Sequence, residues 1–182
     1  MIKKQMIKFE NVQKSFGSLH VLRGVDLEIE EGRTTAIIGG SGCGKSVLIK
    51  HIIGLLQPDS GHVYVDGVDV TTLDVRGLNE VRKKISMVFQ NSALFDSLNI
   101  IDNLALGLRR HTKLDESTIR EKVRKALSLV NLDGIENKFP AELSCGMRKR
   151  AAIARAVITD PEVILYDEPT TGLDPIMSDV IN

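Results

Sequence analysis

The alternation of apolar and polar residues divides the chain into a strand-rich first part and a helical second part. Residues 25–30 alternate apolar and acidic side chains, which is typical of a half-buried strand, and segments 7–12 and 62–66 look similar. Residues 33–38, 85–89 and 163–166 are short runs with the pattern of buried strands. We therefore expect a core sheet with an antiparallel flank near the start of the chain.

Helical periodicity is strongest after residue 91. Asp115 is placed to cap a helix that has its apolar positions on one face, and residues 132–134 end it. A further helix is expected over residues 147–158, where Asp160 and Pro161 stop it. An apolar helix is also predicted over residues 47–56, beginning at Val47. The apolar positions of the first of these helices are Ile119, Val123, Ala126, Leu127 and Val130.

Composition and charge narrow the class of protein. The 24 basic and 24 acidic side chains cancel, so no overall field attracts the chain to nucleic acid or to an anionic membrane. With 42% hydrophobic residues the chain is expected to fold, and no apolar stretch reaches the ~18 residues that span a bilayer. Two cysteines in no metal-ligand spacing suit a reducing cytoplasm. Any membrane role is therefore expected to come through a partner.

The strongest motif lies between the segment at 33–38 and the helix that begins at Val47. Small residues allow backbone N–H groups to converge on phosphate oxygens, and the helix start favours negative charge. Lys45 is expected to reach the β- and γ-phosphates of a nucleotide, and Ser46 to hold Mg²⁺. The alternative is a glycine-rich turn with a surface lysine, but the flanking strand and helix favour nucleotide binding. The motif, G-x-x-x-x-G-K-[ST], consists of Gly39, Gly40, Ser41, Gly42, Cys43, Gly44, Lys45 and Ser46, and these residues together with the following Val47 are the expected contacts of the nucleotide.

A pair of carboxylates follows the apolar strand at residues 163–166. Asp167 is in the position of the acid that holds the metal in phosphate-loop NTPases, and Glu168 is expected to polarise the attacking water. The alternative is an acidic turn before Pro169. Gln90 ends the strand at 85–89 and is expected to reach both the metal and the water.

A third segment, residues 143–147, precedes the helix at 147–158. Ser144 is a good N-cap for that helix. A capped helix start with a small residue at Gly146 also presents N–H groups and a hydroxyl to a phosphate. Both interpretations can hold together.

The order of these motifs resembles that of the ATP-binding-cassette (ABC) ATPases over nearly the whole chain. The resemblance implies an α/β fold in which a P-loop NTPase core (about 1–90 and 161–182) carries an antiparallel β flank and an α-helical subdomain (about 91–160). It also implies ATP and Mg²⁺ as cofactors, and Phe16 stacked on adenine with support from Val21. The alternative for these two residues is a place in the core of the flank.

In that family two subunits pair head to tail around ATP. The resemblance implies that Ser144 and Gly146 of one subunit close over the nucleotide of the other, and that Asp174 belongs to the loop communicating across the dimer. Hydrolysis then drives a transmembrane permease. The expected protein is an ATPase on the cytoplasmic face of the inner membrane that contacts the membrane only through this partner.

Finer details resemble the ATPases of the lipid-asymmetry-maintenance (Mla) transporters, which move phospholipid between bacterial membranes. The resemblance rests on residues 46–55, 94–98 and 147–152, the last of which contains Arg148, Lys149 and Arg150. For these three basic residues the alternative is a solvated helix face. Phospholipid is therefore the expected cargo.

Two features depart from the family pattern. Cys145 replaces a glycine, and if that position needs positive φ the substitution costs roughly 1–2 kcal/mol, so that Cys145→Gly should raise turnover. The family also continues past Asp174 with further strands and a switch histidine, whereas this sequence stops at Asn182. We therefore expect a truncated chain that binds ATP and hydrolyses it poorly. The alternatives are a nucleotide-binding protein without turnover and a soluble ABC ATPase acting on ribosomes or DNA.

Overall fold

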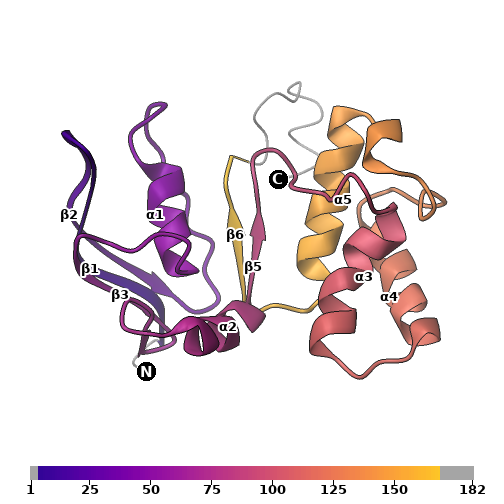
Figure 1. The fold of residues 1–182 in the computed structure, drawn as a ribbon, viewed down its shortest axis with the longest axis horizontal. Coiled ribbons are helices and arrows are strands. Elements are labelled where there is room, and N and C mark those ends of the chain that lie inside the picture. Colours follow the sequence, from indigo (N-terminus) through magenta and orange to yellow (C-terminus); the bar gives the residue numbers. More distant parts are fainter. Residues whose placement is uncertain (1–3, 169–182) are drawn as a thin grey trace. The chain divides into compact units, whose positions relative to one another are not determined.

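An antiparallel sheet occupies the first part of the chain in the computed structural model, which describes residues 4–168. Strands β1 (Gln5–Phe16) and β2 (Leu19–Glu30) form a long hairpin, and β3 (Ser60–Val65) pairs with the other edge of β1 (Figure 1). The short β4 (Val68–Asp69) completes the order β2-β1-β3-β4. The predicted strands at 7–12, 25–30 and 62–66 are confirmed, and the first two are longer than expected.

Helix α1 (Lys45–Ile52) belongs to the same part of the chain. It is shorter than the predicted 47–56 because Gly54 adopts a left-handed φ of 61° and its N–H bonds to the carbonyl of His51. Glycine is favoured there because a left-handed residue ends a helix at no steric cost. The amphipathic helix α2 (Val75–Lys83), which buries only Leu78 and Val81, was not predicted.

The strand predicted at residues 33–38 is wrong. The segment has no regular structure, and Ile38 has 94% of its surface exposed. A strand requires a neighbour for its N–H and C=O groups, and none of the strands in residues 4–168 pairs with this segment. The local apolar pattern suggested a strand, but it carries no information on whether another strand lies beside the segment.

The second part of the chain combines a strand pair with helices. Strands β5 (Ile85–Val88) and β6 (Val163–Tyr166) run parallel with Val88 opposite Tyr166, which confirms the strands predicted there. The helices are α3 (Ile100–His111), α4 (Glu116–Leu129) and α5 (Cys145–Val157), with a short 3₁₀ turn η1 (Pro140–Glu142) before α5. Asn99 and Asp115 cap α3 and α4 by accepting hydrogen bonds from backbone N–H groups of the first turn.

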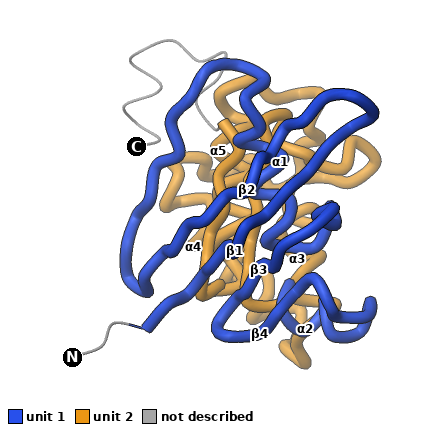
Figure 2. The backbone as a smooth tube through the Cα atoms, turned by 90° about the vertical axis from the view of Figure 1, so that its left-hand side faces the viewer, with its two compact units in different colours: residues 1–82 blue, residues 83–182 orange. Residues whose placement is uncertain are grey.

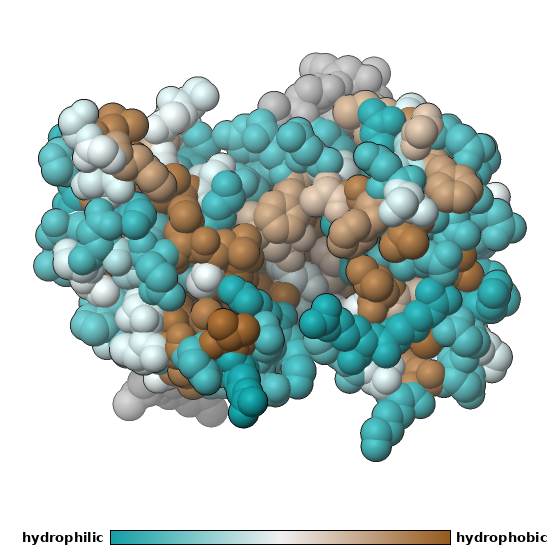
Figure 3. Space-filling model, viewed as in Figure 1, coloured by the Kyte–Doolittle hydropathy of each residue, from teal (hydrophilic) through white to brown (hydrophobic). Residues whose placement is uncertain are grey.

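The chain divides into two compact units, residues 1–82 and 83–182 (Figure 2). The second unit holds α3, α4 and α5 together with β5 and β6, whereas the sequence grouped the strand at 85–89 with the core. The helical subdomain at about 91–160 stays a prediction. The face drawn in Figure 3 is mainly hydrophilic, with apolar residues gathered in patches.

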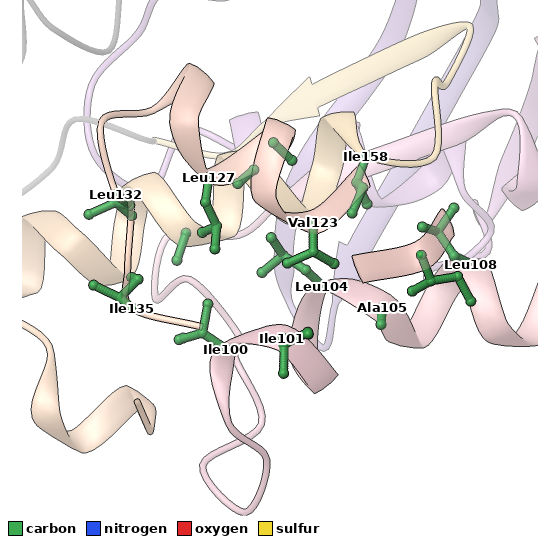
Figure 4. Packing of buried hydrophobic residues seen from close by; sticks show 14 of the residues in the cluster. Ile100, Ile101, Leu104, Ala105, Leu108, Val123, Leu127, Leu132, Ile135 and Ile158 are labelled. Carbon is green, nitrogen blue, oxygen red and sulfur yellow. The ribbon is translucent and has the colours of Figure 1, made fainter. Parts of the chain in front are cut away.

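The hydrophobic core of the second unit lies among its helices. Leu104, Val123 and Leu127 are fully buried, and Figure 4 shows the side chains of Leu104 and Val123 directed toward each other. This core packs α3, α4 and α5 together. Its buried members are Ile100, Ile101, Leu104, Ala105, Leu108, Ile119, Val123, Ala126, Leu127, Leu132, Ile135, Leu143, Ala151, Ala154 and Ile158.

Leu104→Ala is expected to lower the free energy of unfolding by about 2–5 kcal/mol, because it removes buried surface and leaves a cavity between helices. Leu106→Ala on the same helix is the matched control, since Leu106 is 42% exposed. Urea unfolding of both variants measures the difference. Equal losses in the two variants would contradict the assignment of Leu104 to the core.

Candidate nucleotide site

The glycine-rich loop ends at the first residue of α1 with a backbone that only glycine adopts readily. Gly42 and Gly44 have φ values of 78° and 99°, and Gly44 is the N-cap of the helix. The carbonyl of Gly44 accepts the hydrogen bond of Leu48 N at 2.8 Å, the first bond of the helix. Residues 39–43 are exposed, so their N–H groups are accessible to a ligand at the helix start.

Close packing against β2 is a second reason, besides the positive φ, why residue 44 is a glycine. A Cβ atom built on Gly44 would lie 2.8 Å from Cγ1 of Val21 and 3.2 Å from Cδ2 of Leu22. Val21, predicted to support the adenine, therefore lies against the phosphate loop. Its role toward adenine stays a prediction.

Gly44→Ala is expected to destabilise the protein by more than Gly17→Ala. Both glycines have positive φ, but nothing lies within 4 Å of a Cβ built on Gly17, so only Gly44→Ala adds a contact with Val21. The additional loss should be about 1–3 kcal/mol, the usual cost of overpacking. Thermal unfolding measures it. Adding Val21→Ala should recover part of the loss, and the packing explanation fails if it does not.

The lysine of the loop lies folded across it. Nζ of Lys45 donates hydrogen bonds of 2.9 Å to the carbonyls of both Gly39 and Gly40. A phosphate oxygen can replace these two neutral carbonyls with a stronger, charge-assisted bond. Ser46 and Val47 follow in the first turn of α1, where Ser46 can present its hydroxyl to a cation at the phosphates.

Phe16 ends β1 at the tip of the first hairpin and is 46% exposed, so its ring is accessible for stacking. Lys14 lies with Nζ 5.6 Å from the centre of that ring and bonds Asp59 at 2.9 Å. This hydrogen bond holds the pKa of the Asp59 carboxyl below its usual range. The arrangement fits a platform for a purine base, and stacking itself stays a prediction.

The second unit brings together three of the four residues predicted for metal binding and catalysis; the fourth, Ser46, belongs to the first unit. Gln90 follows β5, and Asp167 and Glu168 follow β6; because the strands are parallel and in register, their carboxyl ends meet. Asp167 is buried, and its N–H bonds to the carbonyl of Val88 at 2.9 Å. Nε2 of Gln90 donates to Oε2 of Glu168 at 3.3 Å. Glu168 has a left-handed φ of 49°, which is uncommon for a non-glycine residue and occurs often at functional sites.

The donor types at this edge fit Mg²⁺. Asp167 and Glu168 offer carboxylate oxygens and Gln90 an amide oxygen, all hard ligands. Among residues 4–168 no three His, Cys, Asp or Glu side chains gather as a metal site. Mg²⁺ in nucleotide enzymes takes one or two carboxylates and completes its shell with water and phosphate oxygens. Ser46, Gln90 and Asp167 stay the predicted ligands.

The start of α5 has the cap that the sequence predicts, but not the predicted strain. Oγ of Ser144 accepts the N–H of Met147 at 3.2 Å, and Gly146 lies in the first turn. Cys145 is the first helical residue and is not among the residues with positive φ. The expected strain at Cys145 is therefore wrong, because an L-residue fits the first turn of a helix. Relief of strain no longer predicts a faster Cys145→Gly variant.

The basic residues of α5 do not form a solvated face. Lys149 is 7% exposed, and Nη1 of Arg148 donates to the carbonyl of Leu143 at 2.6 Å. Nη1 of Arg150 donates to the carbonyls of Val130 and Asn131 at 2.9 and 3.0 Å. The helix pattern could not reveal the contacts of Arg150, because the loop that supplies those two carbonyls is about 20 residues away in sequence.

Asp174 lies outside the described residues. Arg155, by contrast, contacts the loop after Gln90, yet no motif in the sequence singled it out.

Within residues 4–168, no helix is both long enough and apolar enough to cross a membrane.

Comparison with known proteins gives relatives over nearly the whole chain. The chain is 48% identical, over 93% of its length, to the probable ribonucleotide transport ATP-binding protein mkl of Mycobacterium leprae. It is 43% identical, over 98% of its length, to the intermembrane phospholipid transport system ATP-binding protein MlaF of Haemophilus influenzae. It covers 49% of the first relative and 67% of the second, so it spans about half the length of the mkl protein.

A solved structure has the same fold. A dimeric ATP-binding cassette in a post-hydrolysis state, bound to ADP and phosphate, matches with a TM-score of 0.90 and 34% identity. The match covers 97% of this chain and 79% of that one. The family model for the ABC transporter matches residues 22–171, which include the phosphate loop, Gln90, the start of α5 and the carboxylate pair. The chain belongs to the ABC transporter family and carries its ATP-binding domain.

Proposed function

We propose that this protein binds and hydrolyses ATP as the ATPase subunit of an ABC transporter that moves phospholipid across the cell envelope. The observation that carries the proposal is the meeting of Gln90, Asp167 and Glu168 at the carboxyl ends of β5 and β6, in a chain that also has a complete phosphate loop. ABC family membership supports the coupling to transport.

Nucleotide binding rests on the first unit. The exposed loop residues donate N–H groups to phosphate oxygens, and Lys45 exchanges the carbonyls of Gly39 and Gly40 for the β- and γ-phosphates. Phe16 offers a flat apolar surface to adenine. Mg²⁺ held by Ser46, Gln90 and Asp167 would neutralise charge on the phosphates.

Hydrolysis rests on Glu168. Its carboxylate accepts the hydrogen bond of Gln90, which orients it at the strand end, and a carboxylate held in this way can take a proton from an attacking water. Gln90 can then donate to the same water and fix its direction. The role of these residues is to hold and move one proton, while the phosphate loop holds the group that is transferred.

We further propose that the active form is a pair of subunits. Ser144 and Gly146 sit at an exposed, capped helix start that presents N–H groups, and a solved relative with the same fold is dimeric. In the pair, this segment closes on the nucleotide of the partner. A transmembrane permease then receives the motion at the cytoplasmic face of the inner membrane, and no contact with nucleic acid is involved.

The names of two relatives point to different cargoes, and the proposal of phospholipid follows one of them. MlaF is named for phospholipid transport and mkl for ribonucleotide transport, and both are similar to this chain. The protein purified with its membrane partner and reconstituted into phospholipid vesicles should transfer labelled phospholipid when ATP is added. Transfer of labelled ribonucleotide in place of lipid would overturn the cargo and leave the ATPase assignment intact.

Phosphate release measured against protein concentration tests the activity. If two subunits share each nucleotide, turnover should rise faster than linearly at low concentration and vanish in Glu168→Gln. ATP binding without any turnover would identify a nucleotide-binding protein that is not an ATPase. A linear rise would contradict the paired form.

A further inference from the structure

The loop that follows Gln90 contains an unusual backbone conformation. Ser92 and Ala93 have φ values of 62° and 47°, the one adjacent pair of non-glycine residues with positive φ in the part of the chain that the structure describes. L-residues seldom adopt this conformation, and it persists only where surrounding contacts hold it. Ser92 N donates to the carbonyl of Phe89 at 2.9 Å, so the turn is directly joined to the backbone that precedes Gln90.

Arg155 supplies the contacts from outside the loop. Its Nη1 donates to the carbonyl of Ala93 at 2.7 Å and its Nη2 to the carbonyl of Ser92 at 2.9 Å. The planar fork of a guanidinium fits two neighbouring carbonyls at once, which a lysine ammonium cannot reproduce. The two strained residues are therefore the two that this side chain binds.

Helix α5 gives Arg155 a rigid base. Ala152 and Ala156 of the helix pack against Val88, which lies two residues before Gln90 on β5. The helix is thus packed on the strand that precedes the turn, while Arg155 binds the turn itself. Helix α5 therefore contacts the backbone on both sides of Gln90, at Val88 before it and at Ser92 and Ala93 after it.

The far end of the loop is held separately. Asn103, fully buried on α3, accepts the N–H of Phe95 at 2.7 Å and donates to the carbonyls of Phe95, Leu98 and Asn99 at 2.9–3.0 Å. Arg155 bonds the part of the loop nearest Gln90, and Asn103 bonds the part nearest α3.

We propose that Arg155 is the positioning residue for Gln90: by holding Ser92 and Ala93 in the left-handed turn, it directs the Gln90 amide to Glu168. The inference rests on the proposed ATPase function. If the guanidinium is lost, the turn relaxes and the amide no longer stays within hydrogen-bond distance of Oε2 of Glu168, which is 3.3 Å away in this structure.

The first test needs no nucleotide. Hydrogen exchange of the full protein should be about tenfold or more faster over residues 91–94 in Arg155→Met, because the turn opens without global unfolding. Arg150→Met is the matched control, since Arg150 lies on the same helix and binds the carbonyls of Val130 and Asn131, a different loop with a positive φ at Asn131. Unchanged exchange over residues 91–94 in Arg155→Met would overturn the proposal.

The second test measures coupling to Gln90. Arg155→Met should lower kcat by about tenfold to a hundredfold and should change KM for ATP no more than Gln90→Ala does. Combined with Gln90→Ala, it should cost nothing further, because the residue it positions is already gone. The loss of kcat in Arg155→Lys should be intermediate between those of the wild type and Arg155→Met. Any loss of kcat that Arg150→Met causes by itself should add in full to the loss caused by Gln90→Ala, because Arg150 does not position Gln90. Additive losses for Arg155→Met would overturn the positioning role even if its exchange is faster.

A third measurement separates this inference from the proposed function. If the wild-type protein binds ATP without turnover, the ATPase assignment fails but the inference can still be tested. ATP affinity is then measured with and without Mg²⁺ in Arg155→Met, in Gln90→Ala and in the double variant, and the increase that Mg²⁺ produces is compared. Arg155→Met and Gln90→Ala should then reduce this increase to the same extent, singly and together. An increase that Arg155→Met leaves unchanged would overturn the inference.

Discussion

Glu168→Gln is expected to reduce ATP turnover by at least about a hundredfold while ATP still binds, since loss of a positioned general base costs a factor of this order. The amide has nearly the shape of the carboxylate but cannot take a proton from water at neutral pH. Phosphate release gives the turnover, and titration with a fluorescent ATP analogue gives the affinity. The affinity should stay within about threefold of wild type.

Glu162→Gln is the matched control for this variant. Glu162 lies just before the same strand, and its ion pair with Lys84 at 3.5 Å is exposed to solvent. Exposed pairs of this kind contribute little, so both turnover and stability should remain near wild type. Turnover in Glu168→Gln close to that of Glu162→Gln would rule out Glu168 as the base.

Lys45→Ala should weaken ATP binding by about tenfold to a hundredfold, because a hydrogen bond to a charged group contributes about 1.5–3 kcal/mol. The loop itself should survive, since its shape depends on the glycines and on the cap at Gly44. Isothermal titration with ATP measures the change. Titration with adenosine, which lacks phosphates, should show no difference between the variant and the wild type.

Lys50→Ala removes a lysine from the same helix without touching the phosphate loop. Lys50 lies in the last turn of α1, at the opposite end of the helix from the phosphate loop. Its ATP affinity should equal that of the wild type. If Lys50→Ala and Lys45→Ala weaken ATP binding equally, the effect is one of general charge and the role assigned to Lys45 is wrong.

The sequence predicted most of the elements in which local pattern and local chemistry agree. The α4 helix, its cap at Asp115, the Ser144 cap and the strands at β5 and β6 follow from periodicity and capping residues close by in the chain. Residues 33–38 failed because a strand also needs a paired neighbour, and α2 was missed because its apolar face consists of only Leu78 and Val81.

Some features of the candidate site could likewise be predicted from the sequence, and others could not. The phosphate loop is visible in sequence because all of its parts are contiguous, and the positive φ at Gly42 and Gly44 accounts for the glycines there. The strain expected at Cys145 could not be judged from sequence, because the sign of φ depends on where the helix begins. Cys145 proved to be its first residue.

By itself, the sequence determined which groups are available: a phosphate loop, two carboxylates after a strand, and a capped helix. Tertiary structure alone decided which of them meet. Parallel pairing of β5 with β6 brings Gln90 to 3.3 Å from Glu168 across 78 positions of the chain, and Arg155 reaches back to Ser92 and Ala93. The physical reason is that hydrophobic burial and strand pairing join segments remote in sequence, whereas a local pattern records only the preferences of neighbours.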